Sequence, residues 1–240
     1  MSNNSLEPDL IIRPKRNLLD IDLKDLWRYR GLIKLLVRRD FVSQYKQTIL
    51  GPLWFLISPI ISVIMFSIIF SGIAGIETDG VPPILFYLSG LTLWNYFSGT
   101  LTGTSNTFVT NASIFGKVYF PRLVIPISHC ISSMIRFLVH FILLLSVMLF
   151  YFFKGYSFNF SVYTLLIPLV FLNTALLALG CGIIISSLTT KYRDFQYLIS
   201  FGVQLWMYAT PIIYPVSIIP EKYSWIISIN PMTPMIEMFK

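Results

Sequence analysis

The sequence predicts an all-α integral membrane protein, and two observations lead to this fold class. First, 55% of the 240 residues are hydrophobic and only 12% are charged, with a mean hydropathy of +0.71. A soluble domain carries roughly 25% charged residues. Second, long apolar runs recur along the chain, each close to the ~20 residues that a helix needs to cross a bilayer. The net charge of +7 therefore does not indicate a nucleic-acid partner.

Five apolar runs have the length of a membrane-spanning helix. They cover residues 53–75, 83–101, 123–153, 162–188 and 195–219. Together they predict a transmembrane domain over residues 51–220. The fifth run contains Pro211 and Pro215, and residues 221–240 are mixed in character. We expect those last residues to form a segment on the outer side that re-enters the membrane.

The positions of the basic residues predict the orientation in the membrane. Fourteen of the 18 Lys and Arg residues fall on one side of the predicted spans: ten before residue 53, and Lys117, Arg122, Lys191 and Arg193. Loops rich in Lys and Arg stay in the cytoplasm. We therefore expect a multi-pass protein of the bacterial inner membrane with a cytoplasmic N-terminus.

The N-terminal region precedes the first span and is predicted in two parts. Residues 1–22 are expected to be a flexible cytoplasmic segment, and residues 23–50 an amphipathic helix. The stripe that defines this helix comprises Leu23, Leu26, Trp27, Ile33, Val37 and Phe41. A basic helix of this kind that contains Trp lies flat on the membrane surface. The alternative interpretation is a soluble helical arm.

Residues with catalytic potential are scarce. The chain has no Gly-x4-Gly-Lys loop for binding ATP. His129 and His140 are eleven residues apart among apolar residues, which favours packed histidines over metal ligands. All eleven Asp and Glu residues fall outside the predicted spans. A proton-coupled carrier or an intramembrane hydrolase needs ionisable groups at depth. We therefore expect no enzyme and no metal or cofactor on this chain.

Arg136 is the exception, because it falls within the third span. A charge at this depth costs several kcal/mol unless it is paired or hydrated. One interpretation is that Arg136 faces a pore or an interface and meets an anionic group. The other is that its side chain snorkels or bonds a carbonyl of a neighbouring helix. The sequence leaves both open.

Aromatic residues are dense near the ends of the spans. The candidates for contact with a sugar chain are Trp54, Phe55, Trp94, Tyr96, Trp206, Tyr208 and Tyr214. Aromatic rings collect at membrane interfaces in any case, so an ordinary interfacial belt is the competing interpretation. The alternative is a track on which sugar rings stack weakly and slide, as a polymer channel requires.

Several stretches together resemble the permeases of polysaccharide-exporting ABC transporters. Arg39-Asp40 and the run from Tyr45 to Trp54 resemble the start of that family's first span. The run from Gly116 to Arg122 and the run from Lys191 to Phe195 are similar to its cytoplasmic loops. The outer segment is matched by Tyr208-x-Thr-Pro-Ile-Ile-Tyr-Pro and by Asn230-Pro-Met-Thr-Pro.

The resemblance implies a homodimer of six-span permeases bound to two ATPase subunits, which hold ATP and Mg²⁺. The pair would export an undecaprenyl-linked polysaccharide such as O-antigen, capsule or teichoic acid. Two loops would dock on the ATPases: Lys117, Tyr119, Phe120, Pro121 and Arg122, and Lys191, Tyr192, Arg193 and Asp194. The alternative explanation is that the charges of these loops only set the orientation in the membrane.

The lipid head would meet Arg38, Arg39 or Lys46 at the cytoplasmic rim. The sixth span would begin where this sequence ends, at Lys240, and is expected to be missing.

Three rival functions stay open. The chain could be an ABC permease for drugs or for other lipids. A membrane-bound glycan-lipid enzyme would need carboxylates at the membrane rim or a metal, for which the sequence offers no candidates. An ion channel or a secondary carrier is disfavoured by the absence of acids within the predicted spans.

Overall fold

The computed structural model describes residues 23–46, 48–158 and 162–240, and every regular element within these ranges is helical. The helices are α1 (Leu23–Arg28), α2 (Arg30–Tyr45), α3 (Trp54–Phe66), α4 (Pro83–Ser105), α5 (Thr107–Thr110), α6 (Ala112–Phe115), α7 (Val124–Phe153), α8 (Ile167–Lys191), α9 (Phe195–Tyr208), α10 (Ser224–Ile229) and α11 (Met232–Phe239). The predicted fold class is confirmed. The predicted flexible segment 1–22 lies outside the described residues.

Three helical segments of the described chain are long and apolar enough to cross a membrane: Gly51–Ile73, Val124–Phe153 and Thr164–Lys191. They correspond to the first, third and fourth predicted spans. The first segment is not a uniform α-helix, because Pro59 lies inside α3 and Ser67–Ile73 continues it as a π-helix. Proline and π-turns are the common causes of bends in long helices. The predicted number of five spans is not established.

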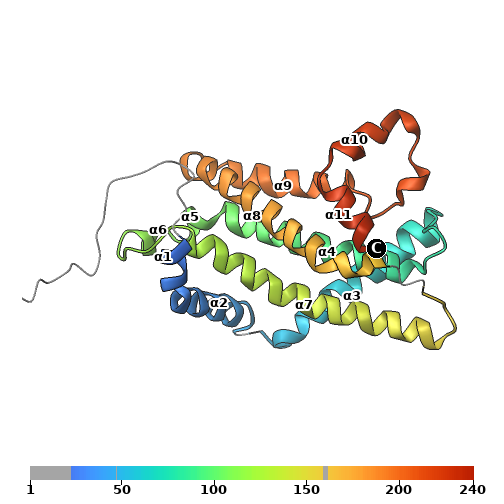
Figure 1. The fold of residues 1–240 in the computed structure, drawn as a ribbon, viewed down its shortest axis with the longest axis horizontal. Helices are drawn as coiled ribbons and strands as arrows, with labels where there is room; N and C mark the ends of the chain where they lie inside the picture. The colour runs from blue at the N-terminus through green and yellow to red at the C-terminus, as the bar shows by residue number, and fades with distance from the viewer. Residues whose placement is uncertain (1–22, 47, 159–161) are drawn as a thin grey trace, which may run out of the picture.

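The second predicted span is α4, which is the central helix of the bundle (Figure 1). It packs against α3, α7, α8, α9 and α11. Buried side chains lie on all its faces, among them the fully buried Tyr87, Leu93 and Phe97. Because protein rather than lipid surrounds α4, it can carry the Ser, Thr and Gly residues that lower its hydropathy. This composition explains why α4 is not among the three apolar segments.

The fifth predicted span is shorter than expected. The helix α9 ends at Tyr208, whereas the sequence predicted a span to residue 219. Fourteen residues of helix reach only about 21 Å. Pro211 and Pro215 explain the end of the helix, because proline lacks the N–H for a helical hydrogen bond and disfavours α geometry in the residue before it. The chain continues through short helical turns to α10 and α11.

Close packing of α4 on α8 depends on a glycine. A Cβ atom added at Gly182 would lie 2.6 Å from Cβ of Thr104 and 3.1 Å from the carbonyl oxygen of Leu101. Real Cβ atoms do not come so close to their neighbours, so this position of α8 requires glycine. Small residues at helix interfaces are how membrane helices approach one another closely.

The N-terminal amphipathic helix is divided in two, and its buried face differs from the predicted stripe. The chain turns at Tyr29 between α1 and α2, and α2 ends at Tyr45 rather than at residue 50. Leu36, which is outside the predicted stripe, is only 4% exposed, whereas Trp27 is 71% exposed. Leu36 packs in a small cluster with Phe120, Val124 and Ile125. Leu26 of α1 and Ile33 of α2, both in the predicted stripe, pack against the same cluster, so the two helices share an apolar face that Leu36 completes.

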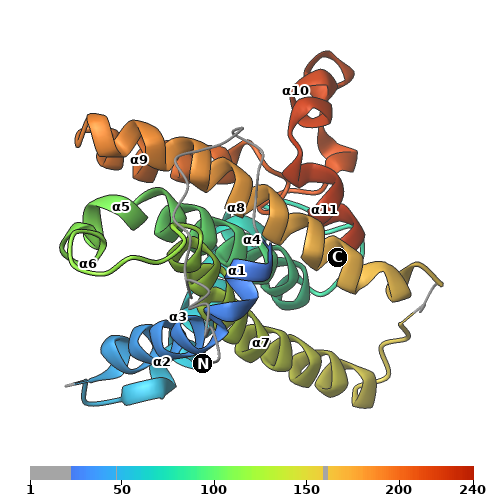
Figure 2. The ribbon, with the colours of Figure 1, turned by 60° about the vertical axis from the view of Figure 1, so that its left-hand side comes forward.

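The two ends of the bundle hold different segments (Figures 1 and 2). One end gathers α1, α5, α6 and the junction of α8 with α9, and the other end holds α10 and the end of α7. The charge pattern predicts that these two groups of segments lie on opposite sides of the membrane. The described structure separates them in space as that prediction requires.

Candidate functional site

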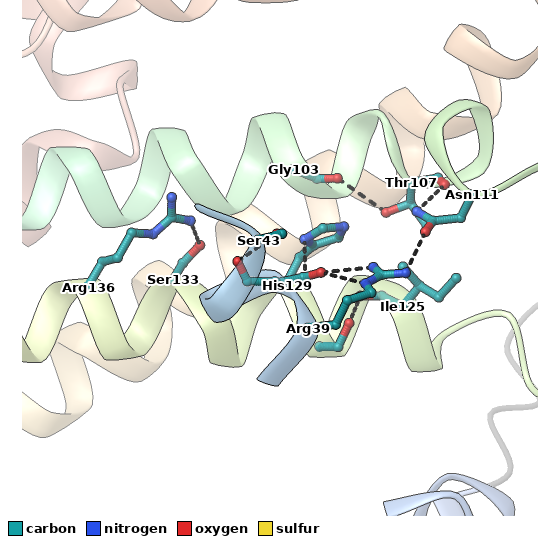
Figure 3. A network of polar contacts seen from close by, with 11 residues as sticks. Arg39, Ser43, Gly103, Thr107, Asn111, Ile125, His129, Ser133 and Arg136 are labelled. Carbon is teal, nitrogen blue, oxygen red and sulfur yellow. Dashed lines mark hydrogen bonds and ion pairs between the residues drawn. The ribbon is translucent and has the colours of Figure 1, made fainter. Parts of the chain in front are cut away.

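A polar network joins α2 to α7 and α5 (Figure 3). Arg39 on α2 donates to Oδ1 of Asp40 through Nε at 3.0 Å and Nη2 at 2.8 Å, and to Oδ1 of Asn111 through Nη1 at 3.4 Å. The other carboxylate oxygen of Asp40 lies 3.3 Å from Nδ1 of His129 on α7. Asn111 in turn donates to the carbonyl of Thr107 at 3.0 Å. The network therefore ties α2 to α7 and to the segment after α4.

This network changes the interpretation of the predicted lipid-head rim. Arg39 already pairs with Asp40 and Asn111, so its guanidinium has a structural role in the described chain. Arg38 and Lys46 are exposed. Sequence reasoning missed that Asn111 binds Arg39 and that His129 meets Asp40, because Asn111 and His129 lie on segments far from α2 in the chain. The adjacent opposite charges of Arg39 and Asp40 were the available signal.

The first predicted coupling loop follows α6 and has an exposed side and an anchored side. Lys117, Tyr119 and Arg122 are exposed, Tyr119 to 61%. Phe120 is buried and stacks on Phe115 with ring centroids 5.3 Å apart. It belongs to the same cluster as Leu36 of α2. Pro121 is half-buried between the two sides. Phe120 thus connects this loop to both α2 and α7.

The second predicted coupling loop is the short turn between α8 and α9. Lys191, Tyr192, Arg193 and Asp194 are all exposed. The ammonium of Lys191 lies 5.1 Å from the ring centroid of Tyr192. The loop directly continues the apolar helix α8 and leads into α9.

A cavity of about 410 Å³ lies between α3, α4 and α7. Four of the predicted site residues line it: Trp54, Phe55, Tyr96 and Arg136. Its other lining residues are Gln44, Ser58, Pro59, Ser62, Asn95, Ser133, Phe137 and His140. The guanidinium of Arg136 donates through Nη2 to Oγ of Ser133 at 2.8 Å (Figure 3). The structure thus brings the intramembrane cation together with three of the candidate aromatic residues.

The remaining candidate aromatics lie elsewhere. Trp94 is only 3% exposed and packs edge-on against Trp206, with ring centroids 6.5 Å apart. Nε1 of Trp206 donates to Oδ1 of Asn230 at 2.9 Å. Tyr208 and Tyr214 lie together beyond this pair, where the Tyr214 hydroxyl donates to the Tyr208 carbonyl at 3.0 Å. Trp94 and Trp206 therefore anchor the outer segment in this structure and do not line an open path.

Asn230 is a residue whose role only the structure shows. Its side-chain oxygen accepts from Trp206 and from the backbone N–H of Met232 at 3.0 Å. Its amide donates to Oγ1 of Thr210 at 2.8 Å and to the carbonyl of Ala209 at 3.2 Å. One buried amide thereby satisfies groups on both sides of the chain reversal after α9. Its place before Pro231 was visible in the sequence, but its partners were not.

A helical bundle in which three helical segments are long and apolar enough to cross a membrane is the architecture of an integral membrane protein. The chain belongs to the ABC-2 type transporter family, whose profile matches residues 31–240. Such permeases are not themselves catalytic and work with an ATP-binding subunit.

Three similar proteins, from two bacteria, are named as O-antigen export permeases. Two O-antigen export system permease proteins RfbA of Klebsiella pneumoniae are 32% identical to this chain over 205 residues, which is 85% of this chain and 77% of each relative. The RfbA permease of Myxococcus xanthus is 27% identical over 220 residues, covering 91% of this chain and 82% of the relative. The predicted family is confirmed.

Proposed function

We propose that this chain is the permease subunit of an exporter of an undecaprenyl-linked polysaccharide similar to O-antigen. The observation that carries the proposal is the similarity, over 85% of the chain, to permeases named for O-antigen export. Two copies of the chain form the path in the bacterial inner membrane, with the N-terminus in the cytoplasm. Two separate subunits bind ATP and Mg²⁺ and hydrolyse the ATP.

Energy coupling runs through the two exposed loops in this proposal. The ATPase subunits contact Tyr119 and Arg122 on the first loop and Arg193 on the second, all of which are exposed. Phe120 transfers the motion to the cluster that holds α2 against α7. Closing the ATPase pair thus shifts the surface helix and the spans together.

The path for the glycan lies between the two copies, beside α3 and α9. Both helices leave apolar side chains uncovered in the single chain, including Ile61 of α3 and Phe201 of α9. The exposed rings of Trp54 and Tyr208 lie on these helices. Either lipid or a second copy must cover such faces. Pairing along α3 and α9 places sugar-stacking rings at the interface of the dimer.

Transport by inside-out membrane vesicles tests the proposal. The vesicles contain the full-length permease and its ATPase subunit, and lipid-linked polysaccharide is supplied outside with ATP. We expect glycan to reach the vesicle lumen, where it is protected from an added glycosidase. Vesicles with an ATPase that cannot hydrolyse ATP are the control.

The same vesicles separate the proposal from a permease for other cargo. Lumenal accumulation of hydrophobic drugs or unglycosylated lipids, without accumulation of polysaccharide, would replace it with a drug or lipid exporter. An enzymatic role would be revealed if the glycan-lipid were chemically changed in the absence of ATP.

A further inference from the structure

We propose that the cavity between α3, α4 and α7 binds an anionic group attached to a sugar, a phosphoryl or a carboxylate, with Arg136 as the charged contact. This inference rests on the proposed function and names the part of the lipid-linked substrate that the cavity holds. Two sources share this chemistry: the diphosphate that joins lipid to glycan, and an acidic sugar of the glycan itself.

The charge of the cavity favours an anion. Of the described residues that line it, Arg136 is the one that carries a formal charge at neutral pH. Arg136 follows the start of α7 by twelve residues, or about 18 Å along the helix axis. Charged side chains at such depth mark sites for substrates or ions. A guanidinium binds phosphoryl or carboxylate oxygens through two parallel hydrogen bonds.

A hydrogen bond within α7 holds the Arg136 guanidinium in position. Ser133, one turn earlier on α7, accepts a hydrogen bond from Nη2 of Arg136 at 2.8 Å (Figure 3). Gly99 of α4 faces the same nitrogen, and a Cβ atom there would lie 3.7 Å away. The absence of a side chain at Gly99 leaves room beside the guanidinium on the α4 side.

The rest of the lining suits a sugar. Amides from Gln44 and Asn95 and the hydroxyl of Ser62 supply hydrogen-bonding groups, and the rings of Trp54 and Phe55 supply apolar faces. Small-molecule sites combine apolar and aromatic walls with a few polar groups in this way. The volume of about 410 Å³ lies at the lower end of the range for such sites. It fits one sugar with its anionic group and is too small for a length of polymer.

The last turn of α2 and the start of α3 form part of the cavity wall. Gln44 in the last turn of α2 and Trp54 at the start of α3 border it, and both are exposed. The preceding turns of α2 pack beside Phe120, in a loop predicted to face the cytoplasm. A substrate that arrives from the cytoplasmic side therefore reaches the cavity along α2.

Equilibrium binding to the permease–ATPase complex in lipid nanodiscs tests this inference. The probes are undecaprenyl diphosphate and undecaprenol, which share a chain and differ in the anion, and two oligosaccharides, one with and one without glucuronic acid. We compare the wild type with Arg136→Gln and Arg136→Lys. The control is Lys154→Gln, which removes an exposed positive charge at the far end of the same helix.

We expect Arg136→Gln to weaken binding of an anionic probe by about tenfold to a hundredfold, the range of a charge-assisted hydrogen bond. Arg136→Lys should restore part of the loss, and Lys154→Gln should change nothing. A loss with undecaprenyl diphosphate alone assigns the anion to the lipid head. A loss with the glucuronic acid probe alone assigns it to the glycan. Unchanged binding of both anionic probes, or an equal loss for neutral and anionic probes, overturns the inference.

A second variant covers the case in which Arg136→Gln does not fold. Ser62→Phe fills the cavity and leaves Arg136 in place, and the Ser62 hydroxyl bonds only within its own helix, to the Ser58 carbonyl. We expect the same loss of anionic probes, and wild-type binding by this variant would contradict the site. Export by wild-type vesicles is measured in parallel. Export with unaffected binding by the variants refutes the cavity site alone, whereas absent export refutes the proposed function.

Discussion

The carboxylate of Asp40 on α2 lies 3.3 Å from the imidazole Nδ1 of His129 on α7. Both side chains are largely buried, with 12% and 24% of their surfaces exposed. Both groups are largely withdrawn from water, so a polar group that loses its neighbour here is not rehydrated as an exposed group would be. It fixes the position of α2 relative to the spans.

Replacing Asp40 by Asn should therefore lower the free energy of unfolding by about 1–3 kcal/mol, the cost of leaving buried polar groups with poorer partners. Thermal unfolding of the purified protein in detergent measures the change. A double-mutant cycle with His129→Gln should give a coupling above about 0.5 kcal/mol. Glu77→Gln, at an exposed acid of another loop, serves as the control. Strictly additive effects would show that the two residues do not interact.

The buried face of α2 gives a matched pair of variants. Leu36 is 4% exposed and the adjacent Leu35 is 61% exposed. Leu36→Ala should destabilise the protein by about 2–5 kcal/mol, because it leaves a cavity beside Phe120 and Val124. Leu35→Ala should cost far less in the same unfolding assay. Equal losses would mean that α2 packs on a different face.

Two glycines of α8 test the close packing of α4 against α8. Gly182→Ala places a methyl group 2.6 Å from Cβ of Thr104, so the helices must move apart. We expect a destabilisation of about 1–3 kcal/mol, typical of overpacking. Gly180→Ala meets no atom within 4 Å and should be neutral or slightly stabilising. The test is to compare the melting temperatures of the two variants with that of the wild type. A Gly182→Ala variant that melts like the wild type would contradict the tight contact.

The outer segment should loosen when Asn230 is replaced by Ala. The change removes the acceptor of Trp206 and the donor to Thr210, whose hydroxyl keeps its own bond to the Trp206 carbonyl. Hydrogen–deuterium exchange should rise by tenfold or more in α10 and α11, while α4 and α7 stay protected. Ser228→Ala loses only a local bond to Ser224 and is the control. Unchanged exchange in α10 and α11 would show that the amide does not hold this segment.

The coupling loops should be needed for transport and not for folding. Tyr119→Ala and Arg193→Glu alter exposed side chains, so the variants should melt like the wild type. We expect at least a tenfold loss of ATP-driven export in the vesicle assay, since the contact with the ATPase is lost. Pull-down of the ATPase subunit provides the second measurement. Variants that export normally and retain the ATPase would remove these loops from the proposed mechanism.

Much of the architecture follows from local sequence properties. Long apolar runs require helices in a membrane, because an unbonded backbone N–H or C=O has no water there to satisfy it. The runs that became α7 and α8 were visible for this reason. The end of α9 was not, because apolar composition continues past Tyr208 and the reversal depends on prolines and on the amide of Asn230.

The candidate site was only partly visible in the same way. A charge within an apolar run singles out Arg136 without any knowledge of its neighbours. The apolar run around Arg136 cannot show that Trp54, Asn95 and Tyr96 line the same cavity as Arg136. Trp54 lies on α3 and the other two lie on α4, both far from Arg136 in the sequence. Likewise, Trp94 and Trp54 have the same chemistry, and only packing decides that one is buried and the other exposed.

The sequence by itself determined that this protein is a helical membrane protein of the ABC-2 family and which loops share a side. Composition, apolar runs and basic loops act on each segment separately, so they can be read along the chain. The tertiary structure decided which face of α2 is buried, that Asp40 meets His129, and that Arg136 lines a cavity with aromatic rings. Those outcomes depend on how helices distant in sequence pack against one another, and packing is a property of pairs of segments rather than of any one of them.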